Sequence, residues 1–192
     1  MLNKEQATKI FSDSGALLEG HFRLTSGRHS NQYMQCAQVL KFPQYTEQLA
    51  RHLADKFADD NVEMVVGPAM GGIIVAYEVA RQLNVPGVFC ERQDGAMALR
   101  RGFTITPGQR ILVVEDVVTT GGSVVEVIEV VKSLGGNVVG VGVLVDRSNG
   151  AVDFGIKKEA VLTMDIKSWE AGDCPLCAAG MGEPVKPGSR NS

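Results

Sequence analysis

Residues 110–123 read RILVVEDVVTTGGS, which is the most informative stretch of the chain. The run 111–114 is apolar and mostly β-branched, as expected of a strand buried on both faces of a parallel sheet. Two adjacent carboxylates, Glu115 and Asp116, come next, and a short Thr/Gly segment then leads into the Val-rich run 123–134, which has a helical pattern. The stretch therefore predicts a strand, a loop and a helix N-terminus in direct succession.

The loop at 119–123 has the composition of a phosphate-binding site. Gly121 and Gly122 let main-chain N–H groups approach a ligand closely, and the neighbouring Thr and Ser hydroxyls add donors. The positive end of the helix dipole adds attraction for an anion. Carboxylates beside a bare phosphate would be repulsive, unless the ligand also has hydroxyls, a cation, or a carbon that becomes positive during reaction. A ribose phosphate supplies all of these, so the stretch favours a ribose-phosphate site.

The alternative is that the two acids only end a strand and that the Thr/Gly loop only caps a helix. A Gly-rich turn between a strand and a helix, taken alone, fits either interpretation. The paired acids followed by several hydroxyls favour the binding site. Two competing nucleotide motifs are absent from the sequence, because it has neither GxxxxGK[ST] nor a GxGxxG after a strand.

Outward from this stretch, apolar runs alternate with helical patterns. Strands are expected at 64–67, 85–90, 110–114 and 137–146, and helices at 72–83 and 123–134. Nearer the amino end we expect a helix from Lys4 to about Leu18 capped by Asn3, extended segments at 21–25 and 32–40, and a helix from Pro43. Repeated strand–helix units predict the α/β class, with a parallel sheet flanked by helices and with ligands bound beyond the carboxyl ends of its strands.

Composition bounds the class of protein. The 192 residues fit a single domain, since domains typically have roughly 100–200 residues. A charged fraction of 21% and a net charge of -3 argue against a disordered chain and against bulk-charge binding to nucleic acid or an anionic membrane. The apolar runs are too short to span a bilayer, and the amino end is polar. With four cysteines, these features predict a cytoplasmic protein with reduced thiols.

Cys174-Pro-Leu-Cys177 is a single CxxC pair near the carboxyl end. A structural zinc site would normally need a second pair, and Cys36 and Cys90 are distant in sequence. The favoured interpretation is a pair of simple thiols in a turn, with a metal or redox role as the alternative. The three histidines have no ligand-like spacing, and the last of them is expected on a helix surface; they are His21, His29 and His52.

The complete pattern resembles the type I phosphoribosyltransferases, and among them the orotate phosphoribosyltransferases. VVEDVVTTGGS at 113–123 is similar to the signature with which that family binds phosphoribosyl pyrophosphate (PRPP). Other similar segments follow in the family's order: GHFRLTSGRHSNQY (20–33), VGPAMGGI (66–73), ERQDGAMALRRGF (91–103) and LVDRSNG (144–150). The resemblance implies a type I phosphoribosyltransferase fold, with one domain over 1–192 and a small hood formed by about 1–40 plus the carboxyl-terminal segment.

The resemblance also implies the reaction. Ribose 5-phosphate would pass from PRPP to orotate, giving orotidine 5′-monophosphate and pyrophosphate in de novo pyrimidine (UMP) biosynthesis. Mg²⁺ would ride on the pyrophosphate, with no direct metal ligand implied in the protein. The family is usually homodimeric, with the loop at 92–103 reaching the neighbour's site.

Residue roles follow from the same resemblance. PRPP would be bound by Glu115, Asp116, Val117, Val118, Thr119, Thr120, Gly121, Gly122 and Ser123, with the two acids on the ribose hydroxyls. The pyrophosphate loop would comprise Ala69, Met70, Gly71 and Gly72. Orotate would contact Thr119 and Arg147, and a planar guanidinium suits its carbonyl and carboxylate edges.

Two lysines of the family's pattern are missing. The loop position of a catalytic lysine is Ala96 here, and no lysine occurs between 91 and 109. The second position, just before Ser26, is Thr25. The positive charge of the missing lysines would then be supplied by Arg92, Arg100 and Arg101. Together with the two acids, these arginines make up the expected catalytic set.

These departures keep two alternatives open. One is a PRPP-dependent transferase for another base such as a purine, although Arg147 and the amino-terminal segment weigh against it. The other is a PRPP-sensing regulator without turnover, against which stands the absence of a basic stripe or a separate nucleic-acid-binding domain in the sequence.

Overall fold

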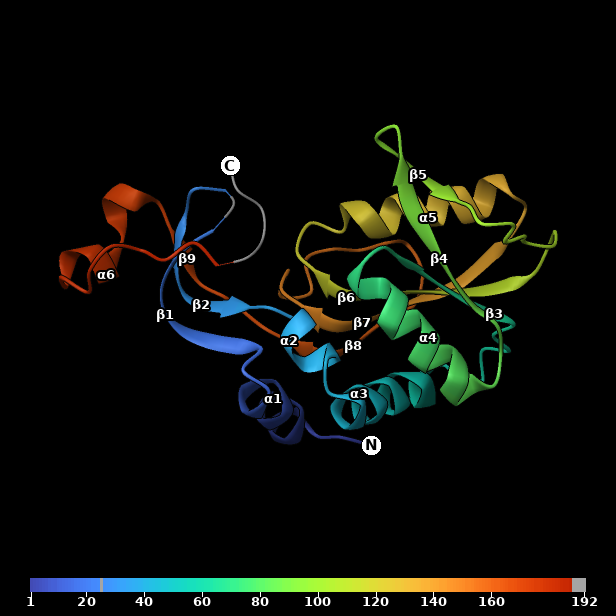
Figure 1. Cartoon of the computed structure of the whole chain (residues 1–192), viewed down its shortest axis with the longest axis horizontal. Helices are drawn as coiled ribbons and strands as arrows, with labels where there is room; N and C mark the ends of the chain where they lie inside the picture. The colour runs from blue at the N-terminus through green and yellow to red at the C-terminus, as the bar shows by residue number, and fades with distance from the viewer. Residues whose placement is uncertain (25, 188–192) are drawn as a thin grey trace.

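A computed structural model describes residues 1–24 and 26–187 and contains two sheets (Figure 1). The larger sheet has the strand order β5-β4-β3-β6-β7-β8. Its strands are β3 (Met64–Pro68), β4 (Gly87–Gln93), β5 (Ala96–Leu99), β6 (Arg110–Val118), β7 (Asn137–Asp146) and β8 (Lys158–Thr163). Every neighbouring pair is parallel except β4 and β5, so the predicted parallel α/β sheet is confirmed.

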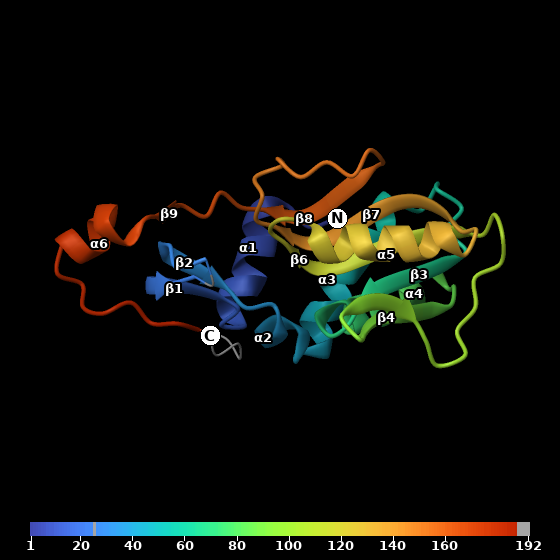
Figure 2. The same ribbon diagram turned by 90° about the horizontal axis from the view of Figure 1, so that it is seen from above.

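Helices cover both faces of the larger sheet (Figures 1 and 2). The helices α3 (Pro43–Lys56) and α4 (Gly71–Leu83) lie on one face, and α5 (Gly122–Ser133) lies on the other. Side chains of β6 alternate between the two core clusters, because Leu112 and Val114 pack with α3 and α4 while Ile111 and Val113 pack beneath α5. All four are fully buried, which explains the unbroken apolar run of the sequence.

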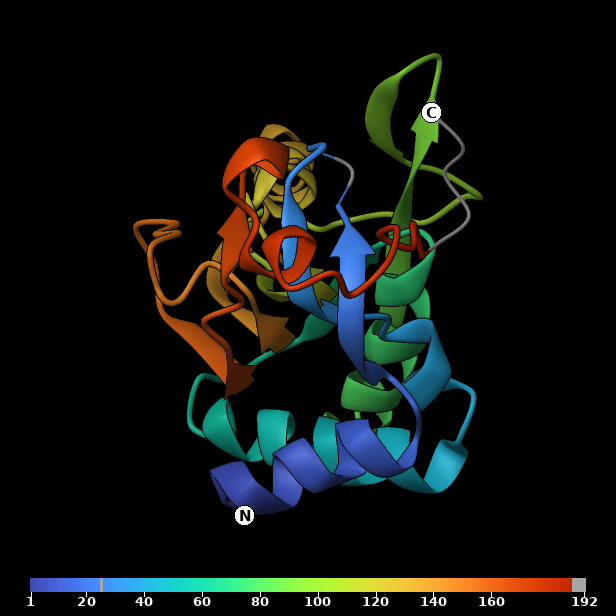
Figure 3. The ribbon, with the colours of Figure 1, turned by 90° about the vertical axis from the view of Figure 1, so that its left-hand side faces the viewer.

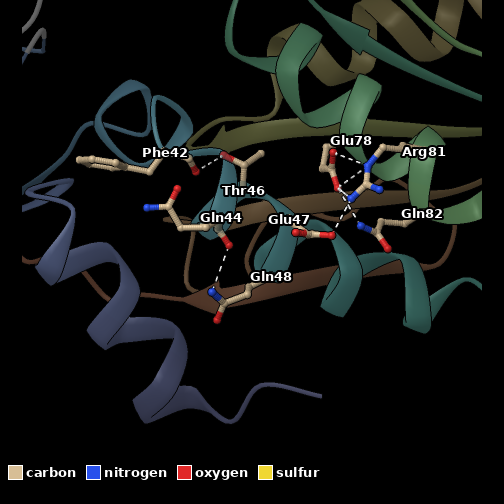
Figure 4. Close-up of polar contacts among 8 residues, drawn as sticks. All are labelled: Phe42, Gln44, Thr46, Glu47, Gln48, Glu78, Arg81 and Gln82. Atoms are coloured by element: carbon tan, nitrogen blue, oxygen red, sulfur yellow. Dashed lines mark hydrogen bonds and ion pairs between the residues drawn. The ribbon is translucent and has the colours of Figure 1, made fainter.

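Polar contacts join α3 and α4 at their exposed edge (Figure 4). Arg81 Nη2 donates to Glu47 Oε1 of α3 at 2.7 Å and to Glu78 Oε1 of its own helix at 2.7 Å. Gln82 Nε2 donates to the same Glu78 oxygen at 2.7 Å. Because the Arg81 and Glu47 side chains are about half exposed, these contacts add orientation more than stability, and the apolar stripes of the two helices dominate.

The smaller sheet lies at one end of the molecule (Figures 1 and 3). It consists of β1 (Leu17–Arg23), β2 (His29–Met34) and β9 (Ser168–Trp169), all antiparallel. After β9 the chain passes through the helix α6 (Pro175–Ala178) and returns along β1, where Val185 pairs with Phe22. Both ends of the chain therefore contribute to this sheet. The division into one domain with a hood at 1–40 stays a prediction of the sequence.

The amino-terminal elements differ from the sequence predictions. The helix α1 (Lys4–Asp13) ends five residues before the expected Leu18, because Gly15 takes a φ of 70° and the chain then turns into β1. The segment 32–40 is not all extended, since residues 37–40 form the short helix α2 (Ala37–Leu40). His52 is buried rather than on the surface, and its Nδ1 accepts a hydrogen bond from the Leu2 backbone N–H at 3.0 Å.

Two strands are longer than expected. The strand β6 runs to Val118, so both acids lie within the strand rather than beyond its end. The strand β4 runs to Gln93 and pairs with β5, so part of the expected loop is a hairpin. Its turn residues, Asp94 and Gly95, have φ values of 52° and 86°, as a two-residue type I′ turn requires. The strand β8 is absent from the sequence predictions.

Other predicted features are confirmed. Asn3 caps α1, with its side chain and that of Gln6 forming a capping box. The helix α3 begins at Pro43, and β7 has the predicted bounds. No helix within the described ranges is long and apolar enough to cross a membrane.

Candidate active site

A cleft of about 380 Å³ opens where β6 leads into α5. Residues 117–124 line it together with Arg92, Glu115 and Glu126. The cleft thus gathers the expected PRPP-binding residues, apart from Asp116, at the carboxyl edge of the larger sheet. This is the edge where ligands of parallel α/β sheets bind.

The loop 119–123 forms the floor of the cleft and requires glycine at one position. Gly121 is the N-cap of α5 and has a φ of 80°. A Cβ there would lie 2.8 Å from Val152 Cγ1 and 2.9 Å from Phe154 Cε1. Within the described part of the chain no side chain caps α5, so N–H groups of its first turn are left for an anionic ligand.

Glu115 and Asp116 converge on the first residues of α4, directly after the turn from β3. A Cβ at Gly71 would lie 2.1 Å from Asp116 Oδ2, and one at Gly72 would lie 3.3 Å from Glu115 Oε1. Only glycine lets the backbone come so near the carboxylates. The turn holds the predicted pyrophosphate loop, Ala69 to Gly72, and its Ala69–Met70 peptide bond is cis. The structure therefore brings together two site segments that are about 45 residues apart in sequence.

Glu115 and Asp116 are neighbouring acids in a buried place, where two negative charges would repel each other. Burial raises the pKa of Glu115 well above its ordinary value, and the neighbouring Asp116 raises it further. Burial also raises the pKa of Asp116, although hydrogen bonds oppose this, among them the one its Oδ1 accepts from the Val117 N–H at 2.8 Å. A ligand that donates hydroxyl hydrogens or carries a cation would relieve this repulsion.

Arg147 lies at the end of β7, beside the end of β6. Its backbone N–H donates to Val118 O at 2.8 Å, so Arg147 and Thr119 leave neighbouring strands at the same edge. Burial lowers the pKa of Arg147, and its buried Nε has no hydrogen-bond partner among the described residues. A buried, unpaired guanidinium donor is costly, and an anionic ligand would satisfy it.

Asp146 holds the start of the loop that contains Arg147. It is 1% exposed, and its Oδ1 accepts hydrogen bonds from the backbone N and the Oγ of Ser148 at 2.8 and 2.6 Å. Lys158 Nζ of β8 donates to Oδ2 at 2.9 Å. Burial alone would raise the pKa of Asp146, but these hydrogen bonds bring it below its ordinary value. Sequence reasoning did not assign this role, because Lys158 reaches Asp146 only through the pairing of β7 with β8.

The three loop arginines are not together. Arg92 lines the cleft and donates to Glu126 Oε1 at 2.9 Å. Arg101 is paired with Glu91 at 2.9 Å and Arg100 with the same carboxylate at 3.5 Å, and neither lines the cleft of its own chain. Thr25, the other position where a lysine was expected, lies outside the described residues.

Away from the cleft, the CxxC pair has partners that sequence spacing did not reveal. The ligand atoms of His21, His29, Cys174 and Cys177 all lie within 4.8 Å of one another. The pairing of β1 with β2 brings the two histidines together, and the return of the carboxyl-terminal segment brings the cysteines to them. Two of the three histidines, which have no ligand-like spacing in the sequence, therefore lie beside the cysteines in the structure.

Comparison with known proteins identifies a family whose members are consistent with this site. The phosphoribosyl transferase domain family matches residues 36–172. The orotate phosphoribosyltransferase of Pelotomaculum thermopropionicum is 60% identical over 189 residues, which cover 98% of this chain and 99% of that protein. The crystal structure of orotate phosphoribosyltransferase from Aeropyrum pernix is 31% identical, with a TM-score of 0.66 over 82% of this chain and 93% of the other.

A further solved structure is the Mycobacterium tuberculosis H37Rv orotate phosphoribosyltransferase in complex with PRPP. It is 26% identical to this chain and has a TM-score of 0.65, over 82% of this chain and 94% of the other. The structural likeness and the high identity over nearly the whole length lead to the same family. The chain belongs to the orotate phosphoribosyltransferases, a group of enzymes within the phosphoribosyltransferase family.

Proposed function

We propose that this protein transfers the ribose 5-phosphate group of PRPP to orotate, releasing pyrophosphate and forming orotidine 5′-monophosphate for UMP biosynthesis. The observation that carries the proposal is the contact of Glu115 and Asp116 with the glycine turn at 71–72, beside a cleft floored by the loop 119–123. An anion site, two hydroxyl acceptors and the backbone that leads from β3 into α4 therefore meet at one sheet edge.

Each part of the site has a role in this reaction. The N–H groups and hydroxyls of 119–123 hold the 5′-phosphate, and the Glu115 and Asp116 carboxylates accept from the ribose hydroxyls. The backbone of 69–72 holds the leaving pyrophosphate. The ring nitrogen of orotate attacks the anomeric carbon while pyrophosphate departs, so the protein accelerates the reaction by alignment and by charge stabilisation. The carboxylates stabilise the positive charge that develops on the ribose.

The acceptor base is proposed from Arg147 and Thr119. Orotate carries a carboxylate that pairs with the buried guanidinium, and its carbonyl edge fits the donors of the same planar fork. A purine base is neutral and would leave that guanidinium without a counter-charge. The unpaired Arg147 Nε therefore favours orotate over the purine alternative.

Magnesium is proposed as the metal of the reaction. Two acidic side chains lie against the turn proposed for pyrophosphate, and Mg²⁺ is commonly bound by one or two carboxylates together with substrate phosphates. The donor set thus fits an ion carried in by PRPP and adjoining Glu115 and Asp116. When bound, the ion neutralises charge on the pyrophosphate.

A homodimer is also proposed, with the segment 92–103 of each chain serving the neighbour's cleft. The support is the position of Arg100 and Arg101, which are paired with Glu91 and do not line their own cleft. Guanidinium groups bind phosphates well, and in this arrangement they do so across the interface.

The test is pyrophosphate release from PRPP and Mg²⁺ in the presence of single bases. We expect turnover with orotate and none with adenine, guanine or uracil. Arg147→Ala should raise the KM for orotate about 100-fold, through the loss of a charge-assisted contact, while the KM for PRPP changes little. Arg51→Ala, an exposed change on α3, is the matched control. Turnover with a purine alone would establish the other transferase, and PRPP binding without turnover would establish the regulator.

A further inference from the structure

Four potential metal ligands converge at the outer end of the smaller sheet. His21 lies on β1 and His29 on β2, and both are 6% exposed. Cys177 lies in the short helix α6 and Cys174 directly precedes it, and α6 lies at the outer end of these strands (Figures 1 and 2). The cluster is remote from the loops of the cleft and shares no residue with it.

Four of the six separations between these atoms are close to those of a tetrahedral site. His21 Nε2 lies 3.1 Å from His29 Nδ1 and 3.6 Å from each of the two sulfurs, and Cys177 Sγ lies 3.3 Å from His29 Nδ1. Zinc bonds of about 2.0–2.1 Å to nitrogen and about 2.3 Å to sulfur place tetrahedral ligands about 3.3 Å apart for two nitrogens and about 3.6 Å apart for nitrogen and sulfur. The observed separations agree with these values.

Hydrogen bonding alone does not account for the arrangement. His21 Nδ1 is 2.8 Å from the carbonyl oxygen of Gly182, which only accepts, so this nitrogen carries the hydrogen. Nε2 of the neutral ring then has a single lone pair, yet three polar groups crowd around it. A metal ion at the centre would use a lone pair of all four atoms at once. The bond from Nδ1–H to a backbone carbonyl is also the usual support of a metal-bound histidine.

The carboxyl-terminal segment has little else to hold it. Between 171 and 187, Cys174 is the one buried residue of the described chain, and Met181 and Val185 are more than half exposed. Two backbone hydrogen bonds tie Val185 to β1, from Arg23 N to Val185 O and from Val185 N to His21 O, both at 2.8 Å. A segment without an apolar core commonly depends on a disulfide or a metal, and all four cysteines of this chain are free thiols.

We propose that His21 Nε2, His29 Nδ1, Cys174 Sγ and Cys177 Sγ bind one structural Zn²⁺ ion, which fastens the carboxyl-terminal segment to the β1–β2 hairpin. Binding converts two thiols into thiolates and releases two protons, so the complex with two neutral imidazoles has no net charge. Four protein ligands close the coordination sphere, so the ion has a structural rather than a catalytic role. Softer divalent ions that accept sulfur and imidazole ligands should bind in the same way.

The experiment uses the full-length protein, purified without a metal-affinity tag from zinc-supplemented cells. We expect elemental mass spectrometry to find one zinc ion per chain. After removal of zinc, Co²⁺ should give the visible absorption bands of a tetrahedral site with a sulfur-to-metal charge-transfer band. Cys174→Ser and Cys177→Ser should each lower the zinc content by at least tenfold, and Cys90→Ala, at a buried thiol of the larger sheet, should leave it unchanged.

Because a variant that loses the metal could also fold poorly, a second measurement uses the wild-type chain alone. Chelation should raise the hydrogen-exchange rate of 170–187 and of β1 at least tenfold, while α5 and β6 keep their protection. The proposal is overturned if the wild type takes up neither Zn²⁺ nor Co²⁺ while its thiols are reduced. It is equally overturned if the purified chain contains a Cys174–Cys177 disulfide, or if the Cys90→Ala variant alone loses the metal.

Discussion

Glu115 occupies a position that costs the folded state free energy. The residue is 8% exposed, the pKa of its carboxyl group is raised by burial and by Asp116, and its Oε1 accepts a hydrogen bond from the Asp116 N–H at 3.0 Å. Such a group is tolerated where a ligand later compensates it. The acid pair thus connects stability to function at the scale of single residues.

Glu115→Gln should therefore stabilise the protein while it lowers activity. Below the ordinary glutamate pKa, both the folded and the unfolded wild type carry the proton, so the variant and the wild type should match. As the pH rises, the unfolded chain releases the proton while the buried carboxyl retains it, and the wild type loses stability relative to the variant. We expect a gain of about 1–2 kcal/mol at pH 7, since each pKa unit corresponds to about 1.4 kcal/mol.

The measurement is urea unfolding at several pH values from acid to neutral. Glu129→Gln, at an exposed position of α5, serves as the control and should show no pH-dependent gain. A variant that is less stable than the wild type at pH 7 would show that the Glu115 carboxylate is already compensated within the free protein.

At the scale of elements, the glycines on the two sides of the turn between β3 and α4 have different functions. Gly67 lies in β3, where a Cβ would be 2.3 Å from the backbone oxygen of Gly72, whereas a Cβ at Gly71 would meet the end of the Asp116 side chain. A backbone atom cannot move aside without shifting the start of α4. A carboxylate can rotate, at the expense of its position in the site.

Gly71→Ala and Gly67→Ala should consequently differ in their effects. For Gly71→Ala we expect kcat/KM to fall at least tenfold, or about 1.4 kcal/mol of transition-state stabilisation, with little change in thermal stability. For Gly67→Ala we expect a loss of about 1–3 kcal/mol of stability, as is typical of overpacking. Gly172→Ala, with no atom within 4 Å of the added Cβ, is the control. Steady-state kinetics and thermal melts on the three variants check the distinction; equal effects at Gly67 and Gly71 would contradict it.

The elements also show what a sequence pattern reveals and what it omits. Hydrophobic periodicity located four of the six strands of the larger sheet, and β6 most clearly, because both of its faces are buried and every residue of 111–114 is apolar. The hydrophobic pattern placed the end of β6 too early. A strand that runs into a binding site can remain hydrogen-bonded to its neighbour after its residues become polar. The β4–β5 hairpin had a readable signal in Asp94-Gly95, which the expectation of a loop overrode.

At the scale of the whole molecule, each cleft of the proposed dimer is completed by residues of the other chain. If the segment 92–103 acts across the interface, an Arg100→Ala/Arg101→Ala chain retains a sound cleft and an Asp116→Asn chain retains a sound loop. Each variant alone should be nearly inactive. Mixing and reassociating them should restore about one quarter of wild-type activity, because half of the dimers are mixed and each has one intact site.

Activity and oligomeric state of the mixture, after brief unfolding and refolding of both chains together, check this prediction. The wild type treated in the same way is the control. A mixture no more active than its components would show that the loop serves its own chain or that the arginines have another role.

Features that depend on contacts between residues far apart in the sequence could not be predicted from it. The phosphate loop and its acids are contiguous in the chain, so their composition was enough to predict a ribose-phosphate site. The cluster of two histidines and two cysteines spans about 150 residues and depends on how the two chain ends meet, which no local spacing encodes. The role of Lys158 depends in the same way on strand pairing.

Because the smaller sheet is built from segments near both ends of the chain, it stays incomplete until late in synthesis on the ribosome. The β1–β2 hairpin emerges early, but its edge partner β9 and the segment that returns along β1 are among the last parts to be made. Until then the hairpin has an unpaired edge, which is open to pairing with other nascent chains. Premature termination between residues 164 and 167 should therefore yield aggregation-prone fragments, even though every strand of the larger sheet has already been translated.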